Sequence, residues 1–122
     1  MAVKFSPNGW MKWLEPYVRQ AATLHLMTEK DGQPAEIEVG GYAPNRMLGA
    51  QWVMGMRGPA VVTASYPPIM WRFQRPQHVA GYEVRDADGN WLWRETFPRI
   101  ADRPEKVDMH ELTVVVELDT EG

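Results

Sequence analysis

From Thr23 onward, apolar and polar residues tend to alternate along the chain, and this pattern limits the possible folds more than any other feature of the sequence. Side chains of a β-strand point to opposite faces in turn, so a period of two predicts strands with one buried face. The strongest case is the segment 79–95, where two such stretches flank Asp86-Ala87-Asp88-Gly89-Asn90. A turn sequence of this kind between two alternating stretches predicts a β-hairpin.

Further strands are predicted where alternating stretches are bounded by turn-forming residues. Leu24 and Leu26 are expected to share a buried face, and Gly40-Gly41 is expected to allow a positive φ or a close backbone approach. In the last strand Leu112, Val114, Val116 and Leu118 are expected to share one face. The expected strands cover residues 23–28, 37–39, 47–54, 60–65, 69–73, 79–85, 91–95 and 109–118, and residues 98–106 are expected to form a loop.

The N-terminal segment has a longer period. Its apolar residues are spaced by three or four positions, which predicts one helix over about residues 8–19. Ser6 can cap the start of this helix, whereas Pro16 is expected to kink it or to end it at Glu15. The apolar stripe consists of Trp10, Trp13, Leu14, Tyr17 and Val18.

These patterns together predict a mainly β fold, an antiparallel β-sandwich or jelly roll with a short N-terminal helix. A chain of 122 residues is the size of one domain, so residues 1–122 are expected to form a helical segment at about 8–19 and a sandwich at about 22–118. The chain has no cysteine, which excludes disulfides and thiol chemistry. Interleaved charges with a net value of −3 and short apolar runs predict neither a nucleic-acid nor a membrane partner.

Catalytic motifs have little support. The three histidines, His25, His78 and His110, would make the metal site of a cupin-like enzyme only if they converged in space. Single histidines on strands are more often exposed or hydrogen-bonded groups, and Glu83 is expected to face Arg94 or its neighbour across the hairpin rather than to act as a catalytic acid. The chain has no nucleophile elbow or phosphate-binding loop. We therefore expect no enzymatic activity and no cofactor.

The aromatic residues leave two interpretations open. Trp91 and Trp93 are two positions apart in a predicted strand, so alternation places them on one face. An exposed face of this kind would suit sugar binding, whereas a buried one would belong to the core or to a subunit interface. Six tryptophans and eight methionines are many large apolar groups for one small domain, which indicates burial of some of them between chains.

The order of the motifs is more specific than any single motif. The predicted helix is followed by Ala22-Thr23-Leu24-His25-Leu26-Met27-Thr28 and by Glu36-Ile37-Glu38-Val39-Gly40-Gly41-Tyr42-Ala43-Pro44-Asn45-Arg46, and the second half contains Tyr66-Pro67-Pro68-Ile69, His78-Val79-Ala80-Gly81-Tyr82-Glu83-Val84 and Asp86-Ala87-Asp88-Gly89-Asn90-Trp91-Leu92. Over about residues 8–118 this order resembles small virion proteins of tailed bacteriophages, which are labelled tail-fibre or collar-like, and similar jelly-roll proteins decorate phage heads. Pro44-Asn45 stands where that family usually has an arginine.

The resemblance implies a non-enzymatic structural protein that cements or decorates the capsid exterior by binding across subunits of the major capsid protein. It also implies self-association as a homodimer or a higher symmetric assembly, and synthesis in the cytoplasm of the bacterial host. The alternatives are a tail-fibre or collar component and a glycan-binding module. Exposed apolar and basic character selects three segments for partner binding, although core burial stays an alternative for each: Phe5 and Trp10, then Tyr42, Pro44 and Arg46, then the expected loop of Met54, Met56 and Arg57.

Overall fold

The computed structural model describes residues 3–98 and 107–119. This part of the chain contains the helix α1 (Pro7–Val18), the 3-10 turn η1 (Gly49–Gln51) and ten strands. The strands are β1 (Thr23–Lys30), β2 (Gln33–Glu36), β3 (Asn45–Arg46), β4 (Val53–Arg57), β5 (Val61–Ser65), β6 (Ile69–Gln77), β7 (Gly81–Arg85), β8 (Trp91–Thr96), β9 (Val107–Leu112) and β10 (Val115–Asp119). The fold expected from the sequence, mainly antiparallel β with a short N-terminal helix, is confirmed.

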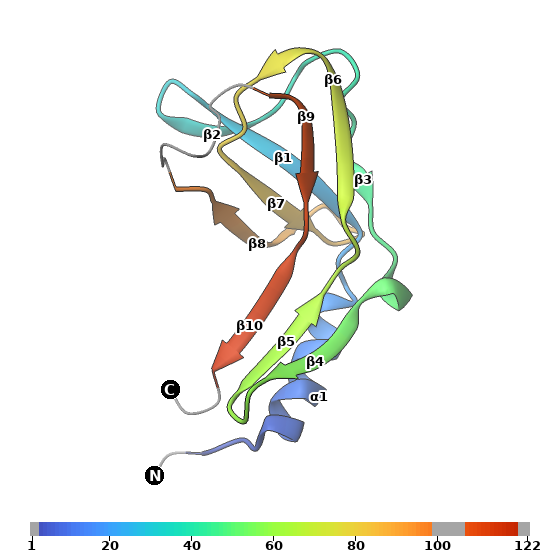
Figure 1. Cartoon of the computed structure of the whole chain (residues 1–122), viewed down its shortest axis with the longest axis vertical. Coiled ribbons are helices and arrows are strands. Elements are labelled where there is room, and N and C mark those ends of the chain that lie inside the picture. Colours follow the sequence, from blue (N-terminus) through green and yellow to red (C-terminus); the bar gives the residue numbers. More distant parts are fainter. Residues whose placement is uncertain (1–2, 99–106, 120–122) are drawn as a thin grey trace.

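The strands form three antiparallel sheets. Sheet A has the order β2-β1-β7-β8, with β3 also paired to β1; sheet B has the order β10-β5-β4; and sheet C is the pair β6-β9. Sheets B and C are continuous, because β5 leads into β6, β9 leads into β10, and the Tyr66 N–H donates to the Val114 carbonyl between them at 3.0 Å. One long bent ribbon therefore runs through the molecule (Figure 1).

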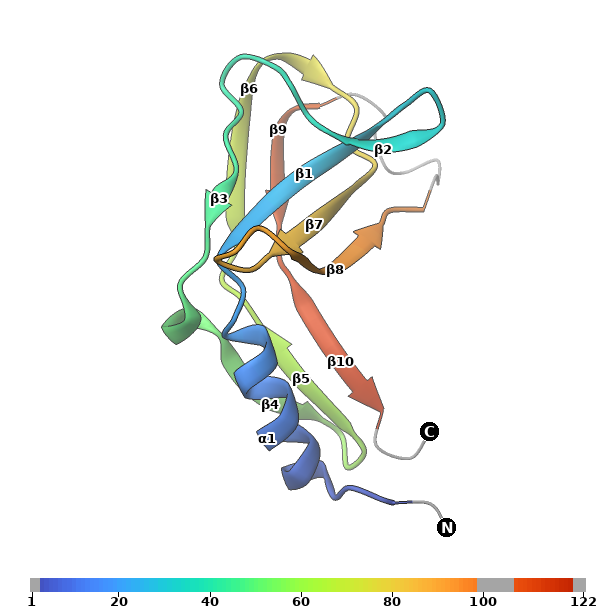
Figure 2. The same cartoon turned by 180° about the vertical axis from the view of Figure 1, so that it is seen from behind.

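The two halves of the molecule are built differently. In the upper half of Figure 1, sheet A and sheet C form two layers around the core, the arrangement of a β-sandwich. In the lower half, α1 packs against β4 and β5 on one face of sheet B, as the view from behind shows (Figure 2). Sheet B therefore has one face covered by a helix and one face that no described element covers.

Burial follows the alternation in the sequence. Leu24 and Leu26 of β1 are fully buried, and in β6 the side chains of Ile69, Trp71 and Phe73 are buried while the residues between them are exposed. These inward side chains of sheets A and C belong to one continuous core, which also contains Leu14 and Val18 of α1. Burial of this apolar surface is the main stabilising contribution to the fold.

The helix predicted over about residues 8–19 is confirmed as α1. The Ser6 side chain accepts a hydrogen bond from the Gly9 N–H at 3.0 Å and caps the first turn. The helix continues through Pro16 to Val18, so of the two effects expected of this proline, a kink or an end at Glu15, the end does not occur. Pro16 is exposed, which leaves room for its ring and lets water solvate the carbonyl that loses its partner.

Local turn chemistry is confirmed at two places. The Asp86 Oδ1 atom accepts hydrogen bonds from the backbone N–H groups of Asp88 and Asn90, both at 3.0 Å, and closes the hairpin of β7 and β8. Gly41 has φ +88°, and a Cβ atom there would lie 2.8 Å from the Arg72 carbonyl oxygen. The glycine is therefore required both by its backbone conformation and by a close approach.

Three strand predictions are wrong. Residues 37–39 follow β2 rather than forming a strand, and residues 47–54 are divided between η1 and the start of β4. The segment 109–118 is two strands, because the chain leaves sheet C after Leu112 and joins sheet B at Val115. Of the loop predicted for residues 98–106, residues 99–106 lie outside the described part of the chain.

Candidate functional site

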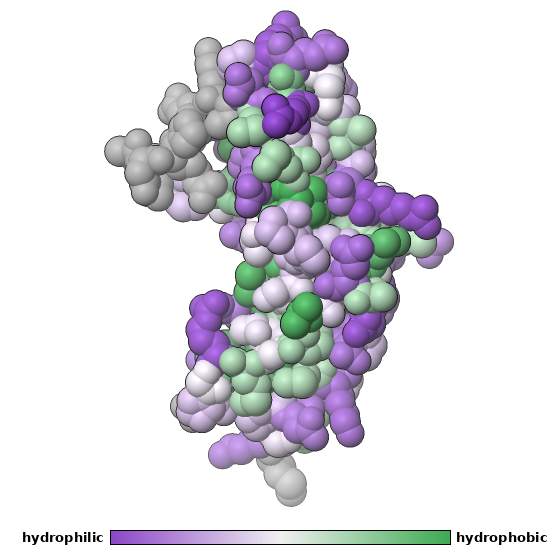
Figure 3. Space-filling model, turned by 45° about the vertical axis from the view of Figure 1, so that its right-hand side comes forward, coloured by the Kyte–Doolittle hydropathy of each residue, from purple (hydrophilic) through white to green (hydrophobic). Residues whose placement is uncertain are grey.

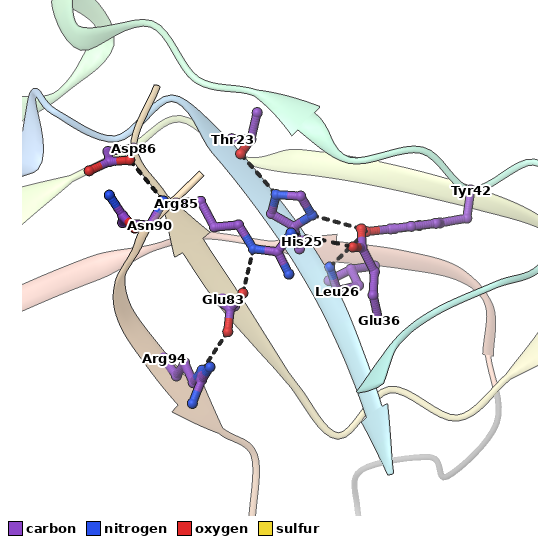
Figure 4. Close-up of polar contacts among 10 residues, drawn as sticks. All are labelled: Thr23, His25, Leu26, Glu36, Tyr42, Glu83, Arg85, Asp86, Asn90 and Arg94. Carbon is purple, nitrogen blue, oxygen red and sulfur yellow. Dashed lines mark hydrogen bonds and ion pairs between the residues drawn. The ribbon is translucent and has the colours of Figure 1, made fainter. Parts of the chain in front are cut away.

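A chain of polar side chains lies on the face of sheet A that points away from the core (Figure 4). Thr23 and His25 alternate along β1 with the buried leucines, and the strand register places His25 opposite Glu83 and Glu83 opposite Arg94. Side chains opposite one another on neighbouring strands share a face. The alternation of β1, β7 and β8 thus brings these groups together.

His25 is held at both ring nitrogens. Its Nδ1 atom lies 2.7 Å from Glu36 Oε2, at the end of β2, and its Nε2 atom lies 2.8 Å from Thr23 Oγ1. The Tyr42 hydroxyl donates to the same Glu36 oxygen at 2.6 Å and accepts from the Leu26 N–H at 3.1 Å. Tyr42 therefore takes the place of a strand partner on β1 in the gap between β2 and β3.

The second half of the network is centred on Glu83. This buried carboxylate is hydrogen-bonded to both Arg85 and Arg94, and the Arg94 guanidinium stacks 4.2 Å from the centre of the Trp91 ring. Arg85 also lies 3.8 Å from Glu36, which joins the two halves. Burial raises the pKa of Glu83, but the hydrogen bonds and charges of the two arginines outweigh it and hold this pKa below its usual range.

The order hydroxyl, imidazole and carboxylate at Thr23, His25 and Glu36 is that of a nucleophile, a base and an orienting acid. Here, however, the Glu36 carboxylate also accepts a hydrogen bond from the Tyr42 hydroxyl and lies beside Arg85, so it connects β1, β7 and the segment after β2 rather than orienting His25 alone. His110 lies elsewhere, against the rings of Trp71 and Phe97. Within residues 3–98 and 107–119 no group of three or more His, Asp or Glu side chains could hold a metal ion. We interpret the network as a set of structural contacts that hold β1, β2, β7 and β8 together.

Tyr42→Phe tests this interpretation. Burial and the Glu36 carboxylate raise the pKa of Tyr42 well above its usual range, so its hydroxyl stays protonated and bonded to Glu36 and Leu26. Removing the hydroxyl leaves both partners short of a hydrogen bond, and we expect the free energy of unfolding to fall by about 1–2 kcal/mol. Urea denaturation measures the loss, and Tyr17→Phe, whose hydroxyl bonds an exposed carbonyl of Leu92, is the control with a smaller effect. Equal losses in the two variants would contradict a structural role of the Tyr42 hydroxyl.

The N-terminal residues chosen for partner binding lie partly inside the molecule. Phe5 packs against the rings of Trp10 and Trp13, with ring centres 4.9 and 5.8 Å apart, and Trp10 packs against the core. The exposed ring at this end is that of Trp13, which the sequence placed on the apolar stripe of the helix. No described contact distinguishes Phe5 or Trp10 as a binding residue.

The second group is divided. Tyr42 points into the polar network, Pro44 is exposed, and Arg46 is exposed on β3. Arg46 lines a shallow groove together with exposed apolar side chains of Leu48, Pro67, Pro68 and Met70. Of this group, Pro44 and Arg46 are accessible to a partner.

The third group is not a loop, because Met54, Met56 and Arg57 belong to β4 at the edge of sheet B. Met54 packs against the core on the side of α1, Met56 is 47% exposed, and Arg57 forms an ion pair with Glu117 of β10. The loop prediction failed because Gly55, Gly58 and Pro59 are turn-forming residues, whereas the strand character of β4 depends on its pairing with β5.

The sequence pattern does not predict the uncovered face of sheet B. The register places Val53, Val61 and Val115 on the face opposite α1, with the Arg57–Glu117 ion pair beside them. Val53 is 65% exposed, and Figure 3 shows apolar side chains gathered over the lower half of the molecule among hydrophilic ones. We call this surface the open face, and the register places nine residues on it: Val53, Gly55, Arg57, Val61, Thr63, Ser65, Val115, Glu117 and Asp119. The alternation of Val53, Gly55 and Arg57 is the signal that could have revealed it.

Trp91 and Trp93 do not share a face. The pairing of β7 with β8 is irregular, so Trp93 lies opposite Val84 while Trp91 lies opposite Arg85. Trp93 packs inward beside Tyr17 and Trp52, and Trp91 is exposed under Arg94. The two-tryptophan platform that a glycan-binding module would need is therefore not formed.

Comparison of the chain with protein-family models, with curated proteins and with solved structures finds no match. In the described residues no helix is long and apolar enough to cross a lipid bilayer.

Proposed function

We propose that this chain is a non-enzymatic structural protein of a bacteriophage particle, which cements or decorates the capsid by binding across subunits of the major capsid protein. The observation that supports this most directly is the open face of sheet B, where three valines lie on a sheet surface that no described element covers. Exposed apolar patches bordered by charged residues are typical of protein-binding surfaces. The phage assignment is supported by the order of the sequence motifs.

The size of the open face favours a repeated contact over a single strong one. Three strands of five residues, spaced about 4.8 Å apart with a rise of about 3.4 Å per residue, cover roughly 250 Å². A stable interface buries about 800 Å² on each partner, so this contact alone would be weak. Many identical copies on one symmetric shell, each with further contacts, would gain in effective concentration.

The location on the particle is tested by stoichiometry. Quantitative mass spectrometry of purified particles of the phage that encodes this chain would compare its copy number with that of the major capsid protein. About one copy per capsid subunit supports the capsid role. A few copies to a few dozen would overturn it in favour of a tail-fibre or collar component, and absence from the particles would overturn the virion assignment.

The surface is tested by rebinding to particles that lack the chain. Val53→Glu places a charge on the open face, and we expect it to reduce occupancy at least tenfold. Met109→Glu is the matched control, because Met109 is a similarly exposed apolar residue on β9. Equal binding by both variants would contradict the use of the open face.

A further inference from the structure

The edge of sheet B formed by β4 is not protected against pairing. Among the described strands β4 pairs with β5 alone, in a regular register, and it contains neither proline nor lysine. Its one charged residue, Arg57, lies at its end and is paired with Glu117. Edge strands usually avoid association through proline, charge or irregular pairing. Other described edges have such features: Pro34 in β2, an irregular register in β8, and Glu117 and Asp119 in β10.

The sequence of β4 is nearly symmetric about Gly55. Met54 and Met56 stand on either side of the glycine, and Val53 and Arg57 stand at the ends. A two-fold symmetric contact brings the same surface of two copies together, so each residue meets its counterpart in reverse order. Antiparallel pairing of two β4 strands about Gly55 places Met54 opposite Met56 in both directions and Val53 opposite Arg57 of the other copy. No like charges meet, and the two-fold position carries no side chain.

We infer that β4 pairs with β4 of a second copy of this chain, so that two copies of sheet B join into one continuous six-stranded sheet. The helices permit this arrangement. α1 lies over β5 and β4, and the two β5 strands would be three strand spacings apart, or roughly 14 Å, which exceeds the 8–10 Å between packed helices. Both open faces then lie side by side on one surface, which doubles the area described above. This inference concerns the isolated chain and does not depend on the proposed function.

The oligomeric state is measured by sedimentation equilibrium of the purified chain. We expect the wild-type chain to be a dimer, and Met56→Lys to raise the dissociation constant at least 100-fold, because a charge on the edge would face Met54 of the second copy. Met70→Lys is the matched control, since Met70 is 52% exposed on β6 and lies outside sheet B. A wild-type chain that stays monomeric up to about 100 μM would overturn the inference. So would a Met56→Lys variant that dimerises like the wild type.

The register is tested by cross-linking. The chain has no cysteine, so Gly55→Cys introduces a single thiol at the position that the two-fold axis places opposite itself. Cα atoms of opposed residues in antiparallel strands lie about 4.5–5.5 Å apart, within the range of a disulfide. We expect a disulfide-linked dimer on mild oxidation of Gly55→Cys and none with Met70→Cys. Equal cross-linking in the two variants, or none in either, would overturn this register.

A Cβ atom at position 55 would lie 3.3 Å from Thr63 Oγ1, so Thr63 must shift slightly, and circular dichroism checks that each variant is folded.

The proposed function and the pairing of β4 can be refuted independently of each other. A dimer that is absent from particles overturns only the proposed function. A monomer present at one copy per capsid subunit overturns only the pairing of β4.

Discussion

Replacing Trp93 with alanine is expected to lower the free energy of unfolding by about 3 kcal/mol, the lower end of the range for large aromatic residues because Trp93 is partly buried. Its ring lies 5.8 Å from Tyr17 of α1 and 5.9 Å from Trp52, and its Nε1–H donates to the Tyr82 hydroxyl at 3.3 Å. Trp93 thus joins the helix, the beginning of sheet B and sheet A, and its removal leaves a cavity where the two halves meet.

Trp91→Ala is the matched control, and we expect it to cost less than about 1 kcal/mol. Trp91 is 55% exposed, and its described aromatic interaction is the stacking of Arg94. Urea denaturation of the two variants measures both values. Similar losses would show that the two rings have similar surroundings, as strict alternation predicts, and would contradict the irregular pairing of β7 with β8.

The orientation of these two rings could not be read from the sequence. Alternation assigns residues two apart to one face, but one extra residue in a strand reverses the assignment beyond it. Leu92 is that residue here, since Trp91 and Trp93 lie opposite the neighbouring residues Arg85 and Val84. The hairpin itself was predictable, because the Asp86 turn depends on local chemistry.

The sheet that each strand joins could also not be predicted from the sequence. Leu112, Val114, Val116 and Leu118 are spaced by two, as in one strand, yet residues 109–112 pair with β6 and residues 115–118 with β5. The change of partner between Leu112 and Val115 follows from the path of the long bent ribbon, which the spacing of these residues does not specify. The same applies to β4, whose strand character depends on its pairing with β5.

The polar network was predictable in part. Glu83 and Arg94 belong to one hairpin, so their ion pair follows from a short-range register and is confirmed. His25 and Glu36 also belong to one hairpin, that of β1 and β2, but Glu36 lies opposite Met27, so the register does not specify its contact with His25. The hydrogen bond from the Leu26 N–H to the Tyr42 hydroxyl joins β1 to a loop, and no periodic pattern specifies it. The virion role and the partner-binding residues stay predictions.

Replacing Glu83 with glutamine is expected to lower the free energy of unfolding at pH 7 by about 2–3 kcal/mol. The carboxylate is buried and bonded to two arginines, and an amide of the same shape cannot neutralise them. The loss stays below the value for fully buried ion pairs because Arg85 and Arg94 are partly exposed, so water can solvate their charges. Glu38→Gln, a change at an exposed carboxylate, is the control with little expected effect.

The cost of Glu83→Gln should depend on pH in one direction. The folded chain holds the pKa of Glu83 below the ordinary value of 4.5, so the carboxylate contributes its full stabilisation above about pH 4.5. This contribution is lost as pH falls through the lowered pKa of the folded chain, because Glu83 is then protonated in both the folded and the unfolded state. Urea denaturation of the wild type and of Glu83→Gln at pH 7 and at decreasing pH below 4.5 should therefore show the difference in unfolding free energy becoming smaller. Other carboxylates titrate in both proteins and cancel in this difference. A difference that stays constant over the same range would mean that the ion pairs of Glu83 do not stabilise the fold.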